Sequence, residues 1–155
     1  MYANILVPID GSPTAQRALE EAAKLAKLSR GRLTLLHVVD TTAHVYGPDA
    51  AGLLVQVQPA MLKAGQQLLE QAKRELGETE LDIQTRVRES GGARVSDAIV
   101  EFAQEDGSDL IVLGTHGRRG IERVMMGSDA EQVARIAPVP VLLVRRPADR
   151  VPAGR

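Results

Sequence analysis

The chain has 155 residues, of which 44% are hydrophobic and 25% are charged, a composition typical of one globular domain that buries most of its unfolded surface. Nineteen basic and twenty acidic residues leave a formal net charge of −1, which excludes the strong positive field that attracts nucleic acids or anionic membranes from a distance. Cysteine is absent and aromatic residues make up 2%, which excludes disulfides, thiol chemistry and cysteine metal sites and leaves little material for stacking on nucleic-acid bases.

The first third of the sequence predicts two strands joined by a helix. Residues 4–9 form a short apolar run, and Met1 leads into it without a basic region or a long apolar segment, so we expect a cytoplasmic protein with no membrane contact. Ser12 followed by Pro13 predicts the N-cap and the first position of a helix that ends near Gly31. The continuous apolar run 33–39 then predicts a strand inside a sheet.

The middle of the sequence predicts the same alternation after an irregular segment. Residues 40–57 show no clear period, so we expect a mobile excursion there, followed by a helix at 61–76. Residues 81–88 alternate apolar and polar side chains, which predicts an edge strand with one face in water. A helix at 95–106 and an apolar strand at 109–113 follow.

The last third predicts a helix at 128–137 and a strand at 139–144. We expect residues 1–146 to form a single domain and residues 147–155 to form a disordered tail. Strands that alternate with helices throughout the chain indicate an α/β fold, an open parallel sheet with helices on both faces.

Two loops of this predicted sheet have the chemistry of a ligand site. The first contains Pro8, Ile9 and Asp10, and the second begins at Gly114. In open parallel sheets, ligands bind outside the carboxyl ends of the strands, so both loops would face one crevice if their strands are neighbours. The alternative is that Asp10 caps the following helix. Ser12 is better placed to cap it, so we favour ligand contact for Asp10.

The second loop is rich in glycine and reads GTHGRRGIERVMMGSD over residues 114–129. Glycine lets the backbone approach a ligand closely, and the helix that Ser128 opens would attract an anion such as phosphate at its N-terminus. The alternative is that the glycines only make turns and that Ser128 is an N-cap. Arg118 and Arg119 are candidates for phosphate contact, although adjacent loop arginines are more often solvated. His37, inside an apolar strand, is more simply a structural histidine than a base.

The spacing of this loop resembles the nucleotide motif of the universal stress protein family. That motif is glycine, two residues, glycine, nine residues, glycine and then serine or threonine, and it stands here complete at Gly114, Gly117, Gly127 and Ser128. The resemblance extends to the stretches NILVPIDGS, LLHVVD, DLIVLGTHG and GSDAEQVARIAPVPVLLVR, and so to nearly the whole chain. Residues 40–57 and the tail lie outside it.

The resemblance implies a five-stranded, Rossmann-like sheet with the strand order 3-2-1-4-5. It also implies that ATP is the ligand. By analogy with ATP-binding members, Asp10 lies near the ribose and the metal, the backbone of Val38 contacts adenine, and Gly114 lies near the ribose. The phosphates are assigned to Gly117, Gly127 and Ser128, and the full set of nucleotide-binding candidates is Pro8, Ile9, Asp10, Val38, Gly114, Thr115, Gly117, Arg118, Gly127, Ser128 and Asp129.

Asp129 departs from many ATP-binding relatives, which often carry an apolar residue after the glycine-serine pair. A carboxylate suits the first turn of a helix but repels a triphosphate. We therefore expect either that this side chain points away from the phosphates or that Mg²⁺ lies between them, with Asp10 and Asp129 as candidate partners of the ion.

The functional expectation is a stress-response protein in which ATP acts as a signal or a stabiliser. The sequence supplies no convincing catalytic base, so any ATP hydrolysis should be slow. Two alternatives remain open, an interaction module of the same fold that binds no nucleotide and an ATP-hydrolysing enzyme. The apolar edge strand 139–144 invites pairing, and the resemblance suggests that the same strand of a second chain covers it in a homodimer.

Overall fold

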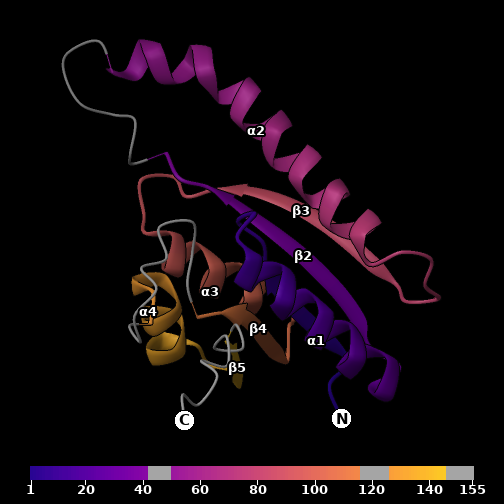
Figure 1. The fold of residues 1–155 in the computed structure, drawn as a ribbon. Coiled ribbons are helices and arrows are strands. Elements are labelled where there is room, and N and C mark those ends of the chain that lie inside the picture. The colour runs from indigo at the N-terminus through magenta and orange to yellow at the C-terminus, as the bar shows by residue number, and fades with distance from the viewer. Residues whose placement is uncertain (42–49, 116–125, 146–155) are drawn as a thin grey trace, which may run out of the picture.

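The structure, a computed structural model, describes residues 1–41, 50–115 and 126–145 of the chain. Its elements alternate from the first strand to the last (Figure 1). The strands are β1 (Asn4–Pro8), β2 (Arg32–Val39), β3 (Ile83–Glu89), β4 (Leu110–Gly114) and β5 (Val141–Val144). The helices are α1 (Pro13–Ser29), α2 (Ala50–Glu75), α3 (Val95–Glu105) and α4 (Ser128–Ile136).

The five strands form one parallel sheet in the order β3-β2-β1-β4-β5, which confirms the predicted fold class and strand order. Each face of the sheet carries its own hydrophobic cluster. On one face, Val7 and Leu35 pack with the alanine-rich side of α1 and with Leu69 of α2. On the other face, Leu6 and Leu36 pack with residues of α3 and α4. Burial on both faces explains the continuous apolar runs of the central strands.

Helix α1 begins as the sequence predicts. Ser12 is its N-cap, and the Ser12 hydroxyl accepts a hydrogen bond of 3.1 Å from the Ala15 N–H. Pro13 occupies the first helical position, where its missing N–H costs nothing. At the other end, Arg30 adopts the left-handed conformation and the Gly31 N–H donates to the Ala26 carbonyl, which closes the helix.

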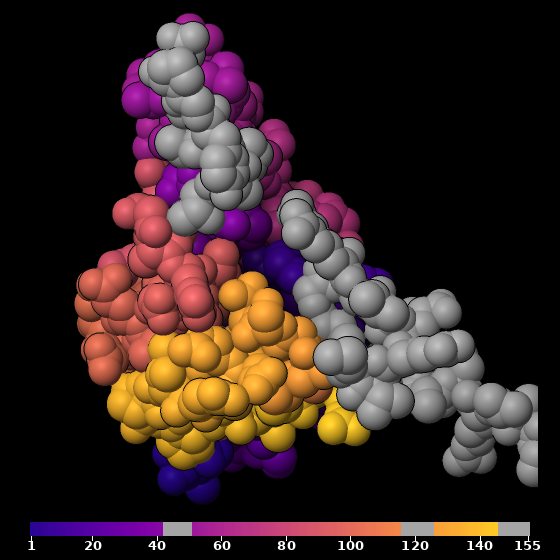
Figure 2. All heavy atoms as spheres, turned by 90° about the vertical axis from the view of Figure 1, so that its left-hand side faces the viewer, coloured from indigo at the N-terminus to yellow at the C-terminus, as the bar shows by residue number. Residues whose placement is uncertain are grey.

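The prediction for residues 40–57 is wrong from residue 50 onward, because α2 begins at Ala50 and runs through Pro59 to Glu75. Its N-terminal part projects beyond the sheet in both views (Figures 1 and 2). Leu53 and Val55 are exposed there. Half-buried Leu54, Val57 and Met61 do recur there at helical spacing, but the exposed apolar side chains beside them obscured this period in the sequence. The excursion at residues 42–49 and the tail predicted at 147–155 lie outside the described residues.

The two sheet edges differ in how they are protected. Edge strand β3 is half-buried, and its Arg88 forms ion pairs with Glu101 and Glu105 of α3. Edge strand β5 starts two residues later than predicted, at Val141. The Pro140 carbonyl still accepts a hydrogen bond from the Ile111 N–H of β4, but proline cannot donate to the ladder in return. No helix in the described residues combines the length and apolar character needed to span a bilayer.

Candidate functional site

The candidate site lies at the carboxyl edge of the sheet. β1 is paired with β2 on one side and with β4 on the other, so the strand order reverses at β1. The ends of these strands, at Pro8, Val39 and Gly114, therefore point in the same direction. The structure thus brings the two predicted loops to one edge at a topological switch point, where open α/β sheets bind their ligands.

The loop after β1 is held by its own backbone and by Asp10. One Asp10 carboxylate oxygen accepts a hydrogen bond of 2.8 Å from the Ser12 N–H. Gly11 between them has a φ of 82°, in the left-handed region that favours glycine. Ser12 rather than Asp10 caps α1, as expected, so the Asp10 carboxylate fixes the turn and stays beside the end of β1.

The loop after β4 closes on itself at its base. The Thr115 N–H donates to the Val144 carbonyl at 3.0 Å, and the Gly127 N–H donates to the Thr115 carbonyl at 2.6 Å. This second bond joins the two ends of the glycine motif and brings the N-terminus of α4 to the end of β4. Gly117 and Arg118, two of the predicted phosphate contacts, lie outside the described residues.

The first glycine of the motif, Gly114, is required by the packing of α1 against β4. A Cβ atom built on Gly114 would lie 2.6 Å from the carbonyl carbon of Thr14 and 2.8 Å from its oxygen. The absent side chain therefore lets the first turn of α1 lie directly against β4. Close packing therefore accounts for glycine at this position, and the ligand contact of Gly114 stays a prediction.

Helix α4 begins at Ser128, as the sequence predicts, but the alternative in which Ser128 is its N-cap is wrong. Gly127 is the N-cap, with a φ of −60°, so no left-handed conformation demands glycine there. Ser128 is the first helical residue and not the cap, and within the described residues no side-chain hydrogen bond caps the helix. The first-turn N–H groups of such a helix suit an anion, because they have no partner within the helix and lie at the positive end of its dipole.

Asp129 interacts with helix α3 and with two other carboxylates. The Ser96 N–H in the first turn of α3 donates to the Asp129 carboxylate, an interaction that lowers the pKa of Asp129. Burial of the carboxyl group raises that pKa more strongly, and the negative charges of Asp40 and Asp10 raise it further. The net pKa lies above the ordinary value for aspartate, so three acidic side chains share the edge of this site. The Asp129 carboxylate thus lies against the first turn of α3.

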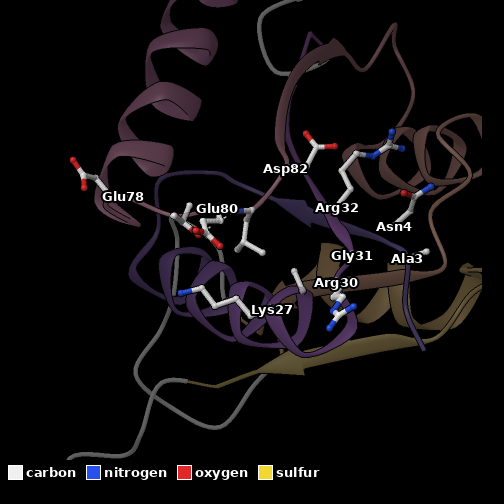
Figure 3. A pocket seen from close by; sticks show the side chains of 12 residues that line it. Ala3, Asn4, Lys27, Arg30, Gly31, Arg32, Glu78, Glu80 and Asp82 are labelled. Carbon is white, nitrogen blue, oxygen red and sulfur yellow. Dashed lines mark hydrogen bonds between the residues drawn. The ribbon is translucent and has the colours of Figure 1, made fainter.

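A pocket of about 550 Å³ lies between the first turns of α3 and α4. Asp40, Ser96, Ser128 and Asp129 are among its lining residues. The sequence analysis missed Asp40 and Ser96, although the position of Asp40 directly after β2 could have indicated it. Figure 2 shows α3 and α4 lying side by side on this face of the molecule. A larger hollow of about 1010 Å³ lies at the opposite, amino edge of the sheet, where charged side chains of both signs line it (Figure 3).

Val38 and His37, neighbours in β2, have different surroundings. Val38 packs against the cluster under α3 and α4. His37 faces α2, and its Nδ1 lies 2.8 Å from the Ile9 carbonyl oxygen, so its structural interpretation is confirmed. No three acidic, histidine or cysteine side chains gather into a metal-binding group within the described ranges.

Comparison with known proteins gives a consistent result. The family model described as "Universal stress protein family" matches residues 1–145. Universal stress protein MJ0531 of Methanocaldococcus jannaschii is 35% identical over 147 residues, which are 95% of this chain and 84% of that protein. The structure of the universal stress protein UspA from Lactobacillus plantarum is 31% identical with a TM-score of 0.81, covering 93% of this chain and 98% of that one.

A further solved structure is that of a universal stress protein in complex with cAMP. It is 30% identical to this chain, with a TM-score of 0.59, and the match covers 93% of this chain and 97% of that chain.

Proposed function

Because the chain belongs to the universal stress protein family, we propose that it binds an adenine nucleotide, ATP in particular, at the carboxyl edge of its sheet. Bound nucleotide acts as a signal or a stabiliser of the folded protein in the response to stress. A relative crystallised in complex with cAMP supports the adenine nucleotide class. The proposal concerns binding, because the described residues supply carboxylates at the site but no evident base for phosphoryl transfer.

The hydrogen bond between the Gly127 N–H and the Thr115 carbonyl carries this proposal. It joins the ends of the intact glycine motif and aligns the uncapped N-terminus of α4 with the ends of β1 and β4. An α-helix N-terminus provides fixed N–H donors and a favourable dipole for phosphate oxygens.

We assign the parts of the nucleotide to the loops by their chemistry. The backbone of Val38 contacts the base, and Asp10 with the adjacent Pro8 and Ile9 lies beside the ribose. The segment of Gly114 and Thr115 borders the ribose region. Ser128 and the N–H groups around Gly127 face the phosphates, and Gly117 and Arg118 complete the phosphate loop.

Mg²⁺ is the proposed companion of ATP. The donors near the site are carboxylate oxygens, which hard divalent cations prefer. Asp10 and Asp129 would hold the ion, directly or through water, and it would offset the repulsion between Asp129 and the phosphates. Burial raises the pKa of Asp129 most, and the nearby negative charges of Asp40 and Asp10 raise it further, which a bound cation would offset.

We further propose a cytoplasmic homodimer formed through β5, in which residues 1–146 are the single domain of each protomer. β5 is an edge strand whose Leu142 is 39% exposed, and the last residue of α4, Ile136, is also 39% exposed. An apolar edge strand without charged residues invites pairing with another strand. The same strand of a second chain would form hydrogen bonds with the backbone groups on the open edge of β5.

The test is to identify the ligand in the protein as purified. We expect mass spectrometry of ligand released from freshly prepared protein to find an adenine nucleotide, and calorimetry to show ATP binding that GTP does not match. Protein that neither retains nucleotide nor binds ATP would support the interaction module instead. ATP turnover well above a slow background would support an enzyme.

A further inference from the structure

The ring of His37 connects helix α2 to the end of β1. Its Nδ1 lies 2.8 Å from the Ile9 carbonyl oxygen. A carbonyl oxygen can only accept a hydrogen bond, so Nδ1 carries the hydrogen and donates it. His37 therefore holds the peptide group that leads directly into Asp10.

Helix α2 fixes the ring from the other side. A Cβ atom built on Gly65 would lie 2.6 Å from the His37 Cδ2 and 3.3 Å from a methyl carbon of Val87. Gly65 is buried and belongs to the middle of α2, where glycine is otherwise unfavourable by about 1 kcal/mol relative to alanine. The glycine thus allows the helix to press on the imidazole, which limits where the ring can move.

The hydrogen bond from His37 ends the ladder between β1 and β2. The Ile9 N–H donates to the Leu36 carbonyl at 2.7 Å, which pairs Ile9 with His37 in the parallel register. In a regular parallel ladder the Ile9 carbonyl would next accept the Val38 N–H. Here the Ile9 carbonyl accepts from the ring of His37, and among the described backbone hydrogen bonds none joins the Val38 N–H to it. The same register turns the N–H and C=O groups of Val38 toward the side of β1, just past its end.

We propose that His37 is a positioning residue that creates the base-binding edge of the nucleotide site, an inference that rests on the proposed function. By donating to the Ile9 carbonyl, it stops β1 from pairing with Val38. The N–H and C=O of Val38 then face the crevice as one donor and one acceptor. This pair suits the edge of a 6-aminopurine, which offers a ring nitrogen as acceptor and an amino group as donor.

Three substitutions separate this role from simple packing. His37→Leu keeps a similar volume but removes the donor, so the Ile9 carbonyl becomes available to the Val38 N–H. His37→Asn keeps an N–H donor at nearly the place of Nδ1. Gly65→Ala leaves the imidazole intact but forces the ring away, because its Cβ would overlap Cδ2.

The first measurement is amide hydrogen exchange at Val38, made by NMR without nucleotide. We expect slower exchange than in the wild type for His37→Leu and Gly65→Ala, because the Val38 N–H joins the ladder in both. His37→Asn should exchange like the wild type. The second measurement is ATP affinity by calorimetry, which we expect to fall roughly tenfold or more in the first two variants as two base contacts are lost, and only slightly in His37→Asn.

Unchanged exchange at Val38 in both His37→Leu and Gly65→Ala overturns the proposal, and so does wild-type ATP affinity in folded His37→Leu. Equal loss of affinity in His37→Asn and His37→Leu also overturns it, because the donor would then be irrelevant. A wild type that binds no nucleotide defeats the proposed function. The exchange measurement still decides in that case whether His37 ends the ladder.

Discussion

Replacement of Gly114 by alanine should destabilise the protein even when no nucleotide is present. The added Cβ would lie 2.6 Å from the carbonyl carbon of Thr14, 2.7 Å from its Cβ and 2.8 Å from its oxygen. Favourable contacts between such atoms lie near 3.5–4.0 Å, so α1 and β4 must separate by roughly 1 Å. Two of the three atoms belong to the backbone of α1, which cannot rotate away as a side chain can.

The expected cost follows from this overlap. Overpacking a well-packed interior typically costs about 1–3 kcal/mol, and a clash with backbone belongs at the upper end of that range. Alanine recovers about 0.4–1 kcal/mol through the lower entropy of the unfolded chain, which leaves a net loss of about 2 kcal/mol. For a chain of this length each kcal/mol lowers Tm by about 2–4 °C, so we expect a decrease of roughly 4–8 °C.

The assay is urea and thermal unfolding of the nucleotide-free protein, followed by circular dichroism. Gly52→Ala is the matched control, because a Cβ on Gly52 meets nothing within 4 Å and lies in helix α2. The control should leave stability unchanged or raise it by up to about 1 kcal/mol. A Gly114→Ala protein as stable as the wild type but unable to bind ATP would refute the packing argument. Glycine at this position would then be needed for contact with the ligand.

Four further predictions concern the pH dependence of stability, the nucleotide and the dimer. Asp129→Asn removes a charge but keeps an acceptor for the Ser96 N–H. Because the pKa of Asp129 is raised in the folded protein, ionisation of this carboxyl lowers the free energy of unfolding, so the wild type should lose stability relative to the variant as the pH rises through that pKa. A stability difference that stays constant from acid to neutral pH in denaturation experiments would contradict this. The same variant should bind ATP several-fold more tightly than the wild type without Mg²⁺ and should depend less on the ion, as calorimetry with and without magnesium will show. Gly117→Val should abolish ATP binding with an unchanged circular dichroism spectrum. Retained affinity would mean that the glycine motif only makes a turn. Leu142→Lys should convert the dimer to a monomer in light scattering, so a wild type that is already monomeric at micromolar concentration contradicts the β5 interface.

Local patterns in the sequence were enough to predict the architecture. The alternation of apolar runs with amphipathic stretches predicted the parallel sheet, and the period of two at residues 81–88 predicted that β3 is an edge. Ser12 and Pro13 predicted the start of α1, because capping depends only on neighbouring residues. The spacing of Gly114, Gly117 and Gly127 indicated the loop after β4, because all residues of this motif belong to one continuous segment of the chain.

Other features depend on segments that are distant in the sequence. In the N-terminal half of α2, exposed Leu53 and Val55 obscured the helical period of the half-buried residues, so the start of this helix was missed. Glycine is needed at position 114 because a side chain there would overlap Thr14, and His37 donates its hydrogen bond to the carbonyl oxygen of Ile9. Asp40 joins Asp10 and Asp129 only because three strand ends and the first turn of α4 meet at one edge. The sequence by itself determined which elements form, through short-range periodicity and capping. Tertiary structure decided which side chains meet, because the contacts between elements are set by sheet register and close packing across the fold.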